Sequence, residues 1–300
     1  MLNPNTPPPD QPEEKARVPR TTSFPERYES HWEQHARQWK HVGPPLRPVA
    51  EDVRFMQNAI AEQRKGHTQS VFQALLLGVT PELASMNWPD GTRLLAVDRC
   101  KGMINQVWPK QGLPTMAWVI RGDWHRLPVR SASIDLVIGD GFFAPLVYPK
   151  DYLSLGAEIR RVLGPGGRYV IRPFVRPQHP ETLAAIDDDL WSGKIGNFHV
   201  LKWRLAMSLH GSLDQGVCLK DVWTTWNQLT ADTRVLVQRL GWHREEIDTI
   251  NAYRDRDTIY TFPTLAELRQ ILATDFVELD CQFPEYELGE CCPTMVFSTK

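Results

Sequence analysis

The sequence predicts an α/β protein with an open, doubly wound sheet. Between residues 71 and 174, short apolar runs with the character of buried strands alternate with helical patterns. Glycine or an acidic residue follows several of these runs directly, as Gly139 and Asp140 follow Ile134–Ile138. In an open parallel sheet, ligands bind beyond the carboxyl ends of the strands. The pattern therefore predicts that several glycines and three carboxylates border one crevice.

Four strands are predicted in this region, and each ends beside a residue suited to a ligand. They are Val71–Leu77 before Gly78, Arg93–Val97 before Asp98, Ala117–Arg121 before Gly122 and Asp123, and Ile134–Ile138 before Gly139 and Asp140. Asp98 follows Gly78 by about 20 residues, the separation expected of a ribose-binding carboxylate in a dinucleotide fold.

Five segments together resemble the class I S-adenosylmethionine (SAM) dependent methyltransferases. Residues 75–78 (LLLG) resemble the first strand and its turn, 96–98 (AVD) the second strand with its acid, and 122–128 (GDWHRLP) the adenine-binding turn. Residues 133–137 (SIDLV) resemble the fourth strand, and 158–167 (EIRRVLGPGG) the helix and turn before the fifth. The last two segments are the most specific. The resemblance covers residues 71–174 and extends to 264–300.

The resemblance implies a Rossmann-like sheet of seven strands in the order 3-2-1-4-5-7-6, with the last strand antiparallel. The final two strands are predicted at Phe276–Phe283 and Thr294–Ser298. Before them, Thr264 and Glu267 have the spacing of a capping box at the start of a helix.

The first turn departs from the family pattern, which reads acidic-x-Gly-x-Gly-x-Gly. Here residues 76–82 read LLGVTPE, so Gly78 alone remains and Leu76 replaces the acid. Glycine matters where a backbone approaches a ligand closely or takes a positive φ. SAM carries no phosphate, so a strict phosphate cradle is not required, and Thr80 is placed to donate to the methionine carboxylate.

SAM is the cofactor that the resemblance implies. Asp98 would accept hydrogen bonds from the ribose hydroxyls, although it is also suited to cap the helix that follows. Asp123 would accept from the adenine amino group, beside Trp124. The expected cofactor contacts are Gly78, Val79, Thr80, Asp98, Arg99, Gly122, Asp123, Trp124, Gly139 and Asp140, with Tyr28 and Trp39 from the N-terminal segment.

Candidates for catalysis and acceptor binding are less specific. His125 and His210 are candidate general bases, and Asp140 is placed to position the acceptor. The expected acceptor contacts are Phe143, Arg172, Trp203 and Trp223. No metal site is predicted, because Cys291 and Cys292 have no histidine near them in the sequence.

Three further segments surround the predicted sheet. Residues 1–24 are rich in proline and charge, which predicts a disordered tail. Residues 25–68 are predicted as N-terminal helices that act as a lid, with an aromatic stripe of Tyr28, Trp32, His35 and Trp39. Packing of this stripe on the sheet edge is the alternative to a lid.

Residues 69–300 are predicted as the methyltransferase domain, and its insertion 175–262 as a helical cap over the strand ends. The expected cap helices are Leu183–Trp191, Phe198–Leu209, Val217–Gln228, Thr233–Leu240 and Arg244–Arg254. The tryptophans of the cap either line an acceptor pocket or pack the cap's own core.

Composition limits the classes of partner. The net charge is −2 and no basic stripe occurs, so nucleic acid is not an expected partner. No apolar run reaches the roughly 18 residues that span a bilayer. The five cysteines form no CxxC motif, which favours reduced thiols and a cytoplasmic location. The oligomeric state is not predicted.

The predicted function is SAM-dependent methylation of a small-molecule acceptor at oxygen or nitrogen. The altered glycine turn supports one alternative, a catalytically silent SAM-binding protein of the same fold. A nucleic-acid methyltransferase is a weaker alternative. A nicotinamide oxidoreductase is disfavoured, because that fold needs more glycines to approach a pyrophosphate.

Overall fold

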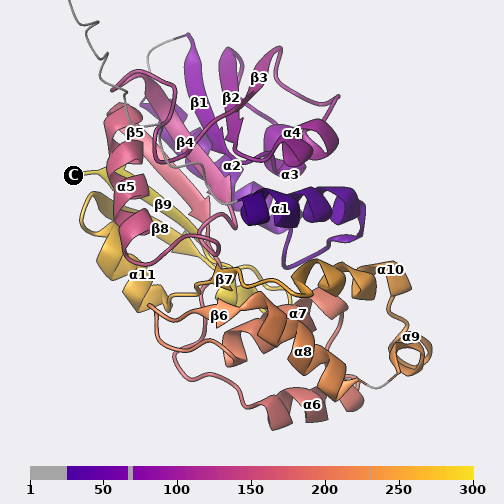
Figure 1. Ribbon diagram of the computed structural model, residues 1–300. Coiled ribbons are helices and arrows are strands. Elements are labelled where there is room, and N and C mark those ends of the chain that lie inside the picture. The colour runs from indigo at the N-terminus through magenta and orange to yellow at the C-terminus, as the bar shows by residue number, and fades with distance from the viewer. Residues whose placement is uncertain (1–25, 67–69, 231) are drawn as a thin grey trace, which may run out of the picture.

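The computed structural model describes residues 26–66, 70–230 and 232–300 (Figure 1). The predicted tail 1–24 lies outside these residues. Side chains are described from His31 onward in α1 (Glu26–Gln38), so the side chain of Tyr28 also lies outside the description.

A seven-stranded sheet forms the centre of the molecule. Its order is β3-β2-β1-β4-β5-β9-β8, and β9 runs antiparallel to β5 and β8, which confirms the predicted topology. The strands are β1 (Phe72–Leu77), β2 (Thr92–Asp98), β3 (Met116–Arg121), β4 (Ile134–Asp140), β5 (Leu163–Arg172), β8 (Phe276–Gln282) and β9 (Thr294–Thr299).

Alternation along the strands supplies a core on each face of the sheet. Leu75 of β1 joins the cluster covered by α5 (Lys150–Val162) and α11 (Leu265–Leu272). Leu76, the next residue, joins the cluster covered by α2 (Ala50–Lys65). The predicted capping box of Thr264 and Glu267 is present at the start of α11.

The two N-terminal helices have different positions. Met56 and Ile60 of α2 are buried against the sheet, so α2 covers a sheet face, and its first turn reaches the end of β5 through Asp52. Helix α1 instead packs on α4 (Lys101–Val107), beside the turn that follows β2, and is followed by the short helix η1 (Trp39–His41).

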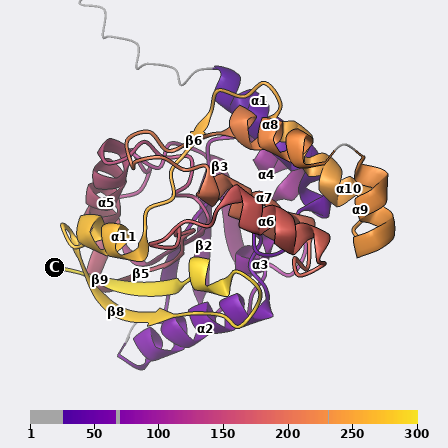
Figure 2. The ribbon, with the colours of Figure 1, turned by 90° about the horizontal axis from the view of Figure 1, so that it is seen from below.

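The insertion lies beyond the strand ends, and α1 lies between it and the sheet (Figures 1 and 2). Its elements are α6 (Leu183–Trp191), α7 (Phe198–Ser208), β6 (Val217–Cys218), α8 (Leu219–Leu229), α9 (Thr233–Leu240), α10 (Arg244–Ile247), η2 (Asp248–Tyr253) and β7 (Ile259–Tyr260). Two predicted helices need correction. Val217 and Cys218 pair with β7 as a strand, and the expected helix Arg244–Arg254 is α10 followed by a 3-10 helix.

Among the described residues, we find no helix with the length and apolar character needed to cross a membrane.

Candidate functional site

The turn after β1 and the acid after β2 face each other at the carboxyl edge of the sheet. Gly78 has φ +96°, a conformation that glycine adopts without strain. A side chain at this position would begin 4.0 Å from Oδ2 of Asp98. Oδ1 of Asp98 accepts from the backbone N–H of Cys100 at 2.7 Å. Cys100, and not Asp98, occupies the N-cap position of α4, so the predicted capping role of Asp98 is wrong. Burial raises the pKa of Asp98 to about 6.

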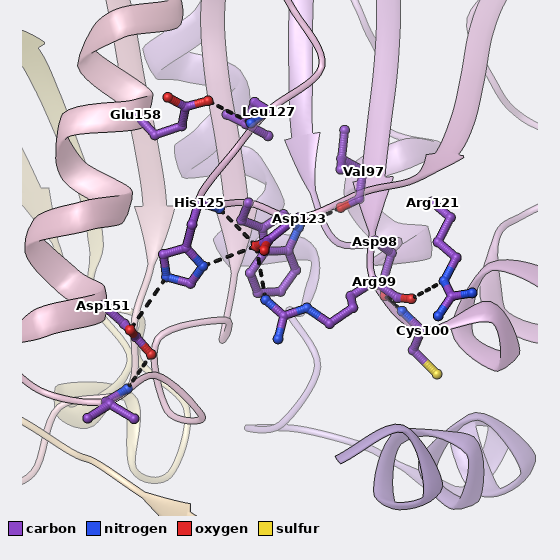
Figure 3. A network of polar contacts seen from close by, with 12 residues as sticks. Val97, Asp98, Arg99, Cys100, Arg121, Asp123, His125, Leu127, Asp151 and Glu158 are labelled. Atoms are coloured by element: carbon purple, nitrogen blue, oxygen red, sulfur yellow. Dashed lines mark hydrogen bonds and ion pairs between the residues drawn. The ribbon is translucent and has the colours of Figure 1, made fainter. Parts of the chain in front are cut away.

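Asp123 stands at the end of the neighbouring strand and is joined to Arg99 (Figure 3). Its Oδ1 accepts from Arg99 at 3.0 Å, from the backbone N–H of His125 at 3.0 Å, and lies 3.1 Å from Nδ1 of His125. Burial acts to raise the pKa of Asp123, but the donors from His125 and Arg99 outweigh it, so the pKa is lowered. Trp124 anchors this turn by donating from Nε1 to the carbonyl oxygen of Val97 at 2.7 Å.

Asp140, at the end of β4, is paired with a buried arginine. Nε of Arg172 donates to Oδ1 of Asp140 at 2.6 Å, and Nη1 donates to the carbonyl oxygen of Pro45 and the hydroxyl of Tyr286. Asp52 lies 3.9 Å from the same guanidinium. Burial raises the pKa of Asp140, and the charge of Arg172 opposes that rise.

This geometry changes the prediction for Arg172. Its side chain is 0% exposed and is surrounded by groups of this chain. The guanidinium therefore neutralises Asp140, and the prediction that Arg172 binds an acceptor is wrong. Asp140 itself lines a cavity at the strand ends.

A cavity of about 90 Å³ lies where α1, the strand ends and the insertion meet. We call it the aromatic cavity. Thr80 and Asp140 line it from the sheet, as do Trp39 from the N-terminal segment and Trp203 from α7. Four residues predicted from the sequence are thus brought together. The indole N–H groups of Trp39 and Trp203 have no hydrogen-bond partner among the described residues.

Several lining residues were not predicted as site residues. They are Trp32 and His35 of α1, Phe174 after β5, and Tyr253 and Tyr260 of the insertion. The aromatic stripe indicated Trp32 and His35, but its periodicity does not say what the stripe faces. Phe174 and the two tyrosines carry no local motif that would have identified them.

Other predicted residues lie outside this cavity. Both ring nitrogens of His210 are engaged, since Nε2 accepts from the backbone N–H of Phe262 at 3.0 Å and Nδ1 lies 2.7 Å from the carbonyl oxygen of Gly211. Phe143 stacks on Phe142 with ring centroids 4.6 Å apart, in the core under α5. His125 lies on the Asp123 turn. Trp223 is partly buried against the core of the insertion, with Arg254 over its ring.

The remaining predicted contacts border the same edge of the sheet. Val79 is buried in the cluster shared by α1 and α4. The backbone N–H of Gly122 donates to the carbonyl oxygen of Asp98. Gly139 pairs with Leu77 of β1 and with Ile171 of β5.

The residues at this edge of the sheet have the hydrogen-bonding groups that SAM binding requires. A buried carboxylate at Asp98 suits a ribose, and the unpartnered indole N–H groups suit a polar acceptor atom of a ligand. The enclosed volume of about 90 Å³ is smaller than the roughly 300–1,000 Å³ of typical ligand pockets. The aromatic cavity alone therefore does not hold a whole SAM molecule, and Asp98 is not among the residues that line it.

Comparison with known proteins identifies the sheet region. A family model described as "Methyltransferase domain" matches residues 77–171. No curated protein matches the chain.

Solved structures share the fold at low identity. One described as a zinc-dependent alcohol dehydrogenase from Rhodobacter sphaeroides has a TM-score of 0.51 at 12% identity, covering 89% of this chain and 98% of that chain. A SAM-dependent methyltransferase from Methanosarcina mazei has a TM-score of 0.47 at 15% identity, covering 79% and 96%. The N-methyltransferase NodS from Bradyrhizobium japonicum, solved with S-adenosyl-L-homocysteine, has 0.48 at 10% identity, covering 90% and 97%. The first likeness concerns the fold alone, and we draw no conclusion from the two below 0.5.

Proposed function

We propose that this protein, a class I SAM-dependent methyltransferase with its methyltransferase domain at residues 77–171, methylates a small-molecule acceptor at oxygen or nitrogen. The observation that carries the proposal is the aromatic cavity. It lies at the carboxyl ends of β1 and β4, the edge where ligands bind in an open α/β sheet. The α1 helix and the insertion cover it, which favours a small acceptor over a polymer.

The walls of the cavity support an acceptor with an apolar or aromatic body. Trp32, Trp39, Phe174 and Trp203 supply large flat surfaces. His35, Asp140 and the hydroxyls of Tyr253 and Tyr260 are the titratable groups among the lining residues. Ligand pockets commonly combine such apolar walls with a few polar groups that fix orientation.

The cofactor would lie along the strand ends. We propose that Gly78, Val79 and Thr80 border its methionine end, and that Asp98 binds the ribose. Arg99, Gly122, Asp123 and Trp124 would surround the adenine, with Gly139 and Trp39 as further contacts. When bound, SAM supplies a sulfonium methyl group, and the chain orients the acceptor toward it and excludes water.

The segments around the sheet have proposed roles as well. Of the N-terminal helices, α1 would act as the lid, since it borders the cavity, and the insertion 175–262 would form the cap that selects the acceptor. A cytoplasmic location remains a prediction from composition.

A labelling experiment tests the function. The purified chain is incubated with methyl-labelled SAM and with separate small-molecule, nucleic-acid and protein fractions of a cell extract. We expect label in the small-molecule fraction. Label in either macromolecular fraction would contradict the proposed acceptor class. SAM binding without label in any fraction would support the silent SAM-binding protein.

Replacing Trp203 by phenylalanine should alter acceptor use and leave SAM affinity nearly unchanged. The smaller ring enlarges the cavity on the insertion side, and such changes in an apolar pocket alter discrimination between acceptors by about 10–200-fold. Steady-state kinetics with acceptors of graded size measure this effect.

Trp226→Phe is the matched control for the Trp203 variant. Trp226 is also buried in the insertion core, against Phe198, and does not line the cavity. The Trp226→Phe variant should therefore change the stability of the protein but not its acceptor preference. The pocket assignment would be wrong if both variants changed acceptor preference to the same extent.

SAM affinity should depend on pH through Asp98. The ribose hydroxyls need an ionised acceptor, and burial raises the pKa of Asp98 to about 6. Affinity should therefore be constant above about pH 7 and fall, by at most about tenfold per unit, as the pH drops below 6. Calorimetric titration between about pH 5 and 8 measures this.

Stability should respond to Asp98 in the opposite direction. Its folded pKa is above the unfolded value of about 3.9, so folding favours the protonated form. The resulting stability is fully present below about pH 4 and is lost as the pH rises through 6. Asp98→Asn should remove both dependences. If the variant keeps the pH dependence of SAM binding, another group is responsible.

A further inference from the structure

His31 and His35 form a buried imidazole pair where α1 meets the insertion. Their ring centroids are 4.4 Å apart and their Nε2 atoms 3.1 Å apart. Nδ1 of His31 lies 3.2 Å from the carbonyl oxygen of Ala252, and its Nε2 lies 3.0 Å from the hydroxyl of Tyr260. His31 is fully buried, whereas His35 also lines the aromatic cavity. The pair therefore connects the cavity to the backbone of the insertion.

These contacts fix which nitrogen of each ring carries the proton. A carbonyl oxygen can only accept, so Nδ1 of His31 donates to Ala252, and Nε2 of the neutral ring carries the lone pair. Nε2 of His35 can approach that lone pair only as a donor, and it shares the lone pair with the hydroxyl of Tyr260, which donates from 3.0 Å. This assignment from the hydrogen-bond network leaves the lone pair of His35 on Nδ1. Within the part of the chain that the structure describes, Nδ1 of His35 has no hydrogen-bond partner.

The surroundings keep both rings neutral. Burial lowers the pKa of His31 to about 4, and it lowers the pKa of His35 well below its usual value. Positive charge on Lys202 and Arg256 acts in the same direction. The other titratable groups that face the pair are His199 of α7, Tyr253 of η2, Tyr260 of β7 and, across the cavity, Asp140 with its partner Arg172.

Lys202 belongs to the same buried region. Its Nζ lies 3.3 Å from Oγ1 of Thr249 and 5.3 Å from the ring centre of Tyr253. Burial lowers the pKa of Lys202 to about 7. His35 is therefore available as an unprotonated base throughout the physiological pH range.

We propose that His35 is the general base of methyl transfer, that His31 positions it, and that the acceptor reacts through a phenolic hydroxyl. This inference rests on the proposed function, because it assumes that the acceptor occupies the aromatic cavity. Among the described lining residues, His35 carries on its neutral ring a lone pair that has no partner, and the ring planes of the cavity suit an aromatic acceptor.

The step balances as a proton transfer coupled to a displacement. The acceptor oxygen forms a bond to the methyl carbon while the carbon–sulfur bond breaks, and the electron pair of that bond neutralises the sulfonium. The hydroxyl proton passes to Nδ1 of His35. The imidazolium that forms donates from Nε2 to His31, which holds its lone pair ready because Ala252 fixes its tautomer.

Because His35 is a weak base, the acceptor hydroxyl has to be comparatively acidic. A buried imidazole of low pKa assists only an acceptor whose proton is comparatively acidic. A phenol has a pKa of about 10, whereas an aliphatic hydroxyl resembles water, with a pKa of about 16. The environment of His35 therefore selects phenols over alcohols.

Kinetics on a series of substituted phenols tests the base. His35→Gln should lower kcat by about 10²–10⁴-fold with an ordinary phenol and leave SAM affinity unchanged. The loss should shrink as the phenol becomes more acidic, since an already ionised acceptor needs no base. For the wild type, the acidic limb of kcat/KM should lie below the usual histidine value of about 6.5. His243→Gln, on an exposed histidine, should match the wild type.

Variants at His31 separate positioning from folding. His31→Gln keeps a carbonyl acceptor for Nε2 of His35 and should retain more kcat than His31→Leu. Nitrogen-15 NMR of the protein alone supplies a readout without turnover, and His35 should appear as the neutral Nε2–H form between about pH 5 and 8. In His31→Leu that tautomer should no longer dominate.

The possible outcomes separate the two proposals. If His35→Gln methylates every phenol as fast as the wild type, or if NMR shows the Nδ1–H tautomer, the base assignment is overturned and the proposed function stands. If the wild type methylates only alcohols or amines, the phenol assignment is wrong. If it methylates no small molecule but labels a macromolecular fraction, the proposed function is wrong, and the assignment of His35, which rests on it, is wrong as well.

Discussion

Replacing Arg172 by leucine should lower the free energy of unfolding by about 3–5 kcal/mol, because a buried carboxylate then loses its cation. Arg172 is fully buried and donates to Asp140 at 2.6 Å, and Asp52 lies near the same guanidinium. Leucine fills part of the space but offers no donor to either acid or to Tyr286. Chemical denaturation with urea measures the loss.

Two controls show whether charge is responsible. Arg269→Leu breaks an arginine–glutamate pair on the surface, where Arg269 is 44% exposed, so it should cost less than about 1 kcal/mol. Adding Asp140→Leu to Arg172→Leu should recover part of the stability, since replacing a whole buried pair by apolar groups costs less than breaking it. Equal losses from Arg172→Leu and Arg269→Leu would contradict the importance of the buried pair.

Replacing Asp98 by alanine should weaken SAM binding by about 1.5–3 kcal/mol, which is roughly 10–150-fold in Kd. The carboxylate stands at the end of β2, faces Gly78 across the turn and is 8% exposed. Alanine removes the charged acceptor for the ribose and leaves the Cys100 N–H without its partner. Titration calorimetry at about pH 7.5 measures the change, since Asp98 is ionised there.

Asp98→Asn and Asp221→Ala complete this comparison. The asparagine keeps an oxygen for Cys100 but not the charge, so it should lie between the wild type and the alanine variant. Asp221 is exposed on α8 of the insertion, and its removal should leave Kd unchanged. If Asp98→Ala binds SAM as tightly as the wild type, Asp98 does not bind the ribose.

The buried ion pair and the candidate histidines of this protein show which features local sequence patterns do not predict. The sequence places Asp140 at the end of β4 and Arg172 at the end of β5, but it does not predict that the two side chains form a pair. Among the histidines, it indicates His210 and His125 as candidate bases, and His35 only as a member of the aromatic stripe. Only the fold shows that Phe262 and Gly211 occupy the two ring nitrogens of His210, whereas Nδ1 of His35 has no partner within the described part of the chain.

By itself, the sequence determined the strands of the seven-stranded sheet, their order through the family resemblance, the acid at the end of β2 and the capping box of Thr264 and Glu267. These features depend on neighbours a few residues apart, because backbone hydrogen bonding and side-chain alternation are local. The tertiary structure decided that His31 meets Ala252, 221 residues away, and that Trp203 lines the cavity while Trp223 does not. Such contacts depend on how the insertion packs against α1, and a long-range packing of this kind leaves no periodic signal in the chain.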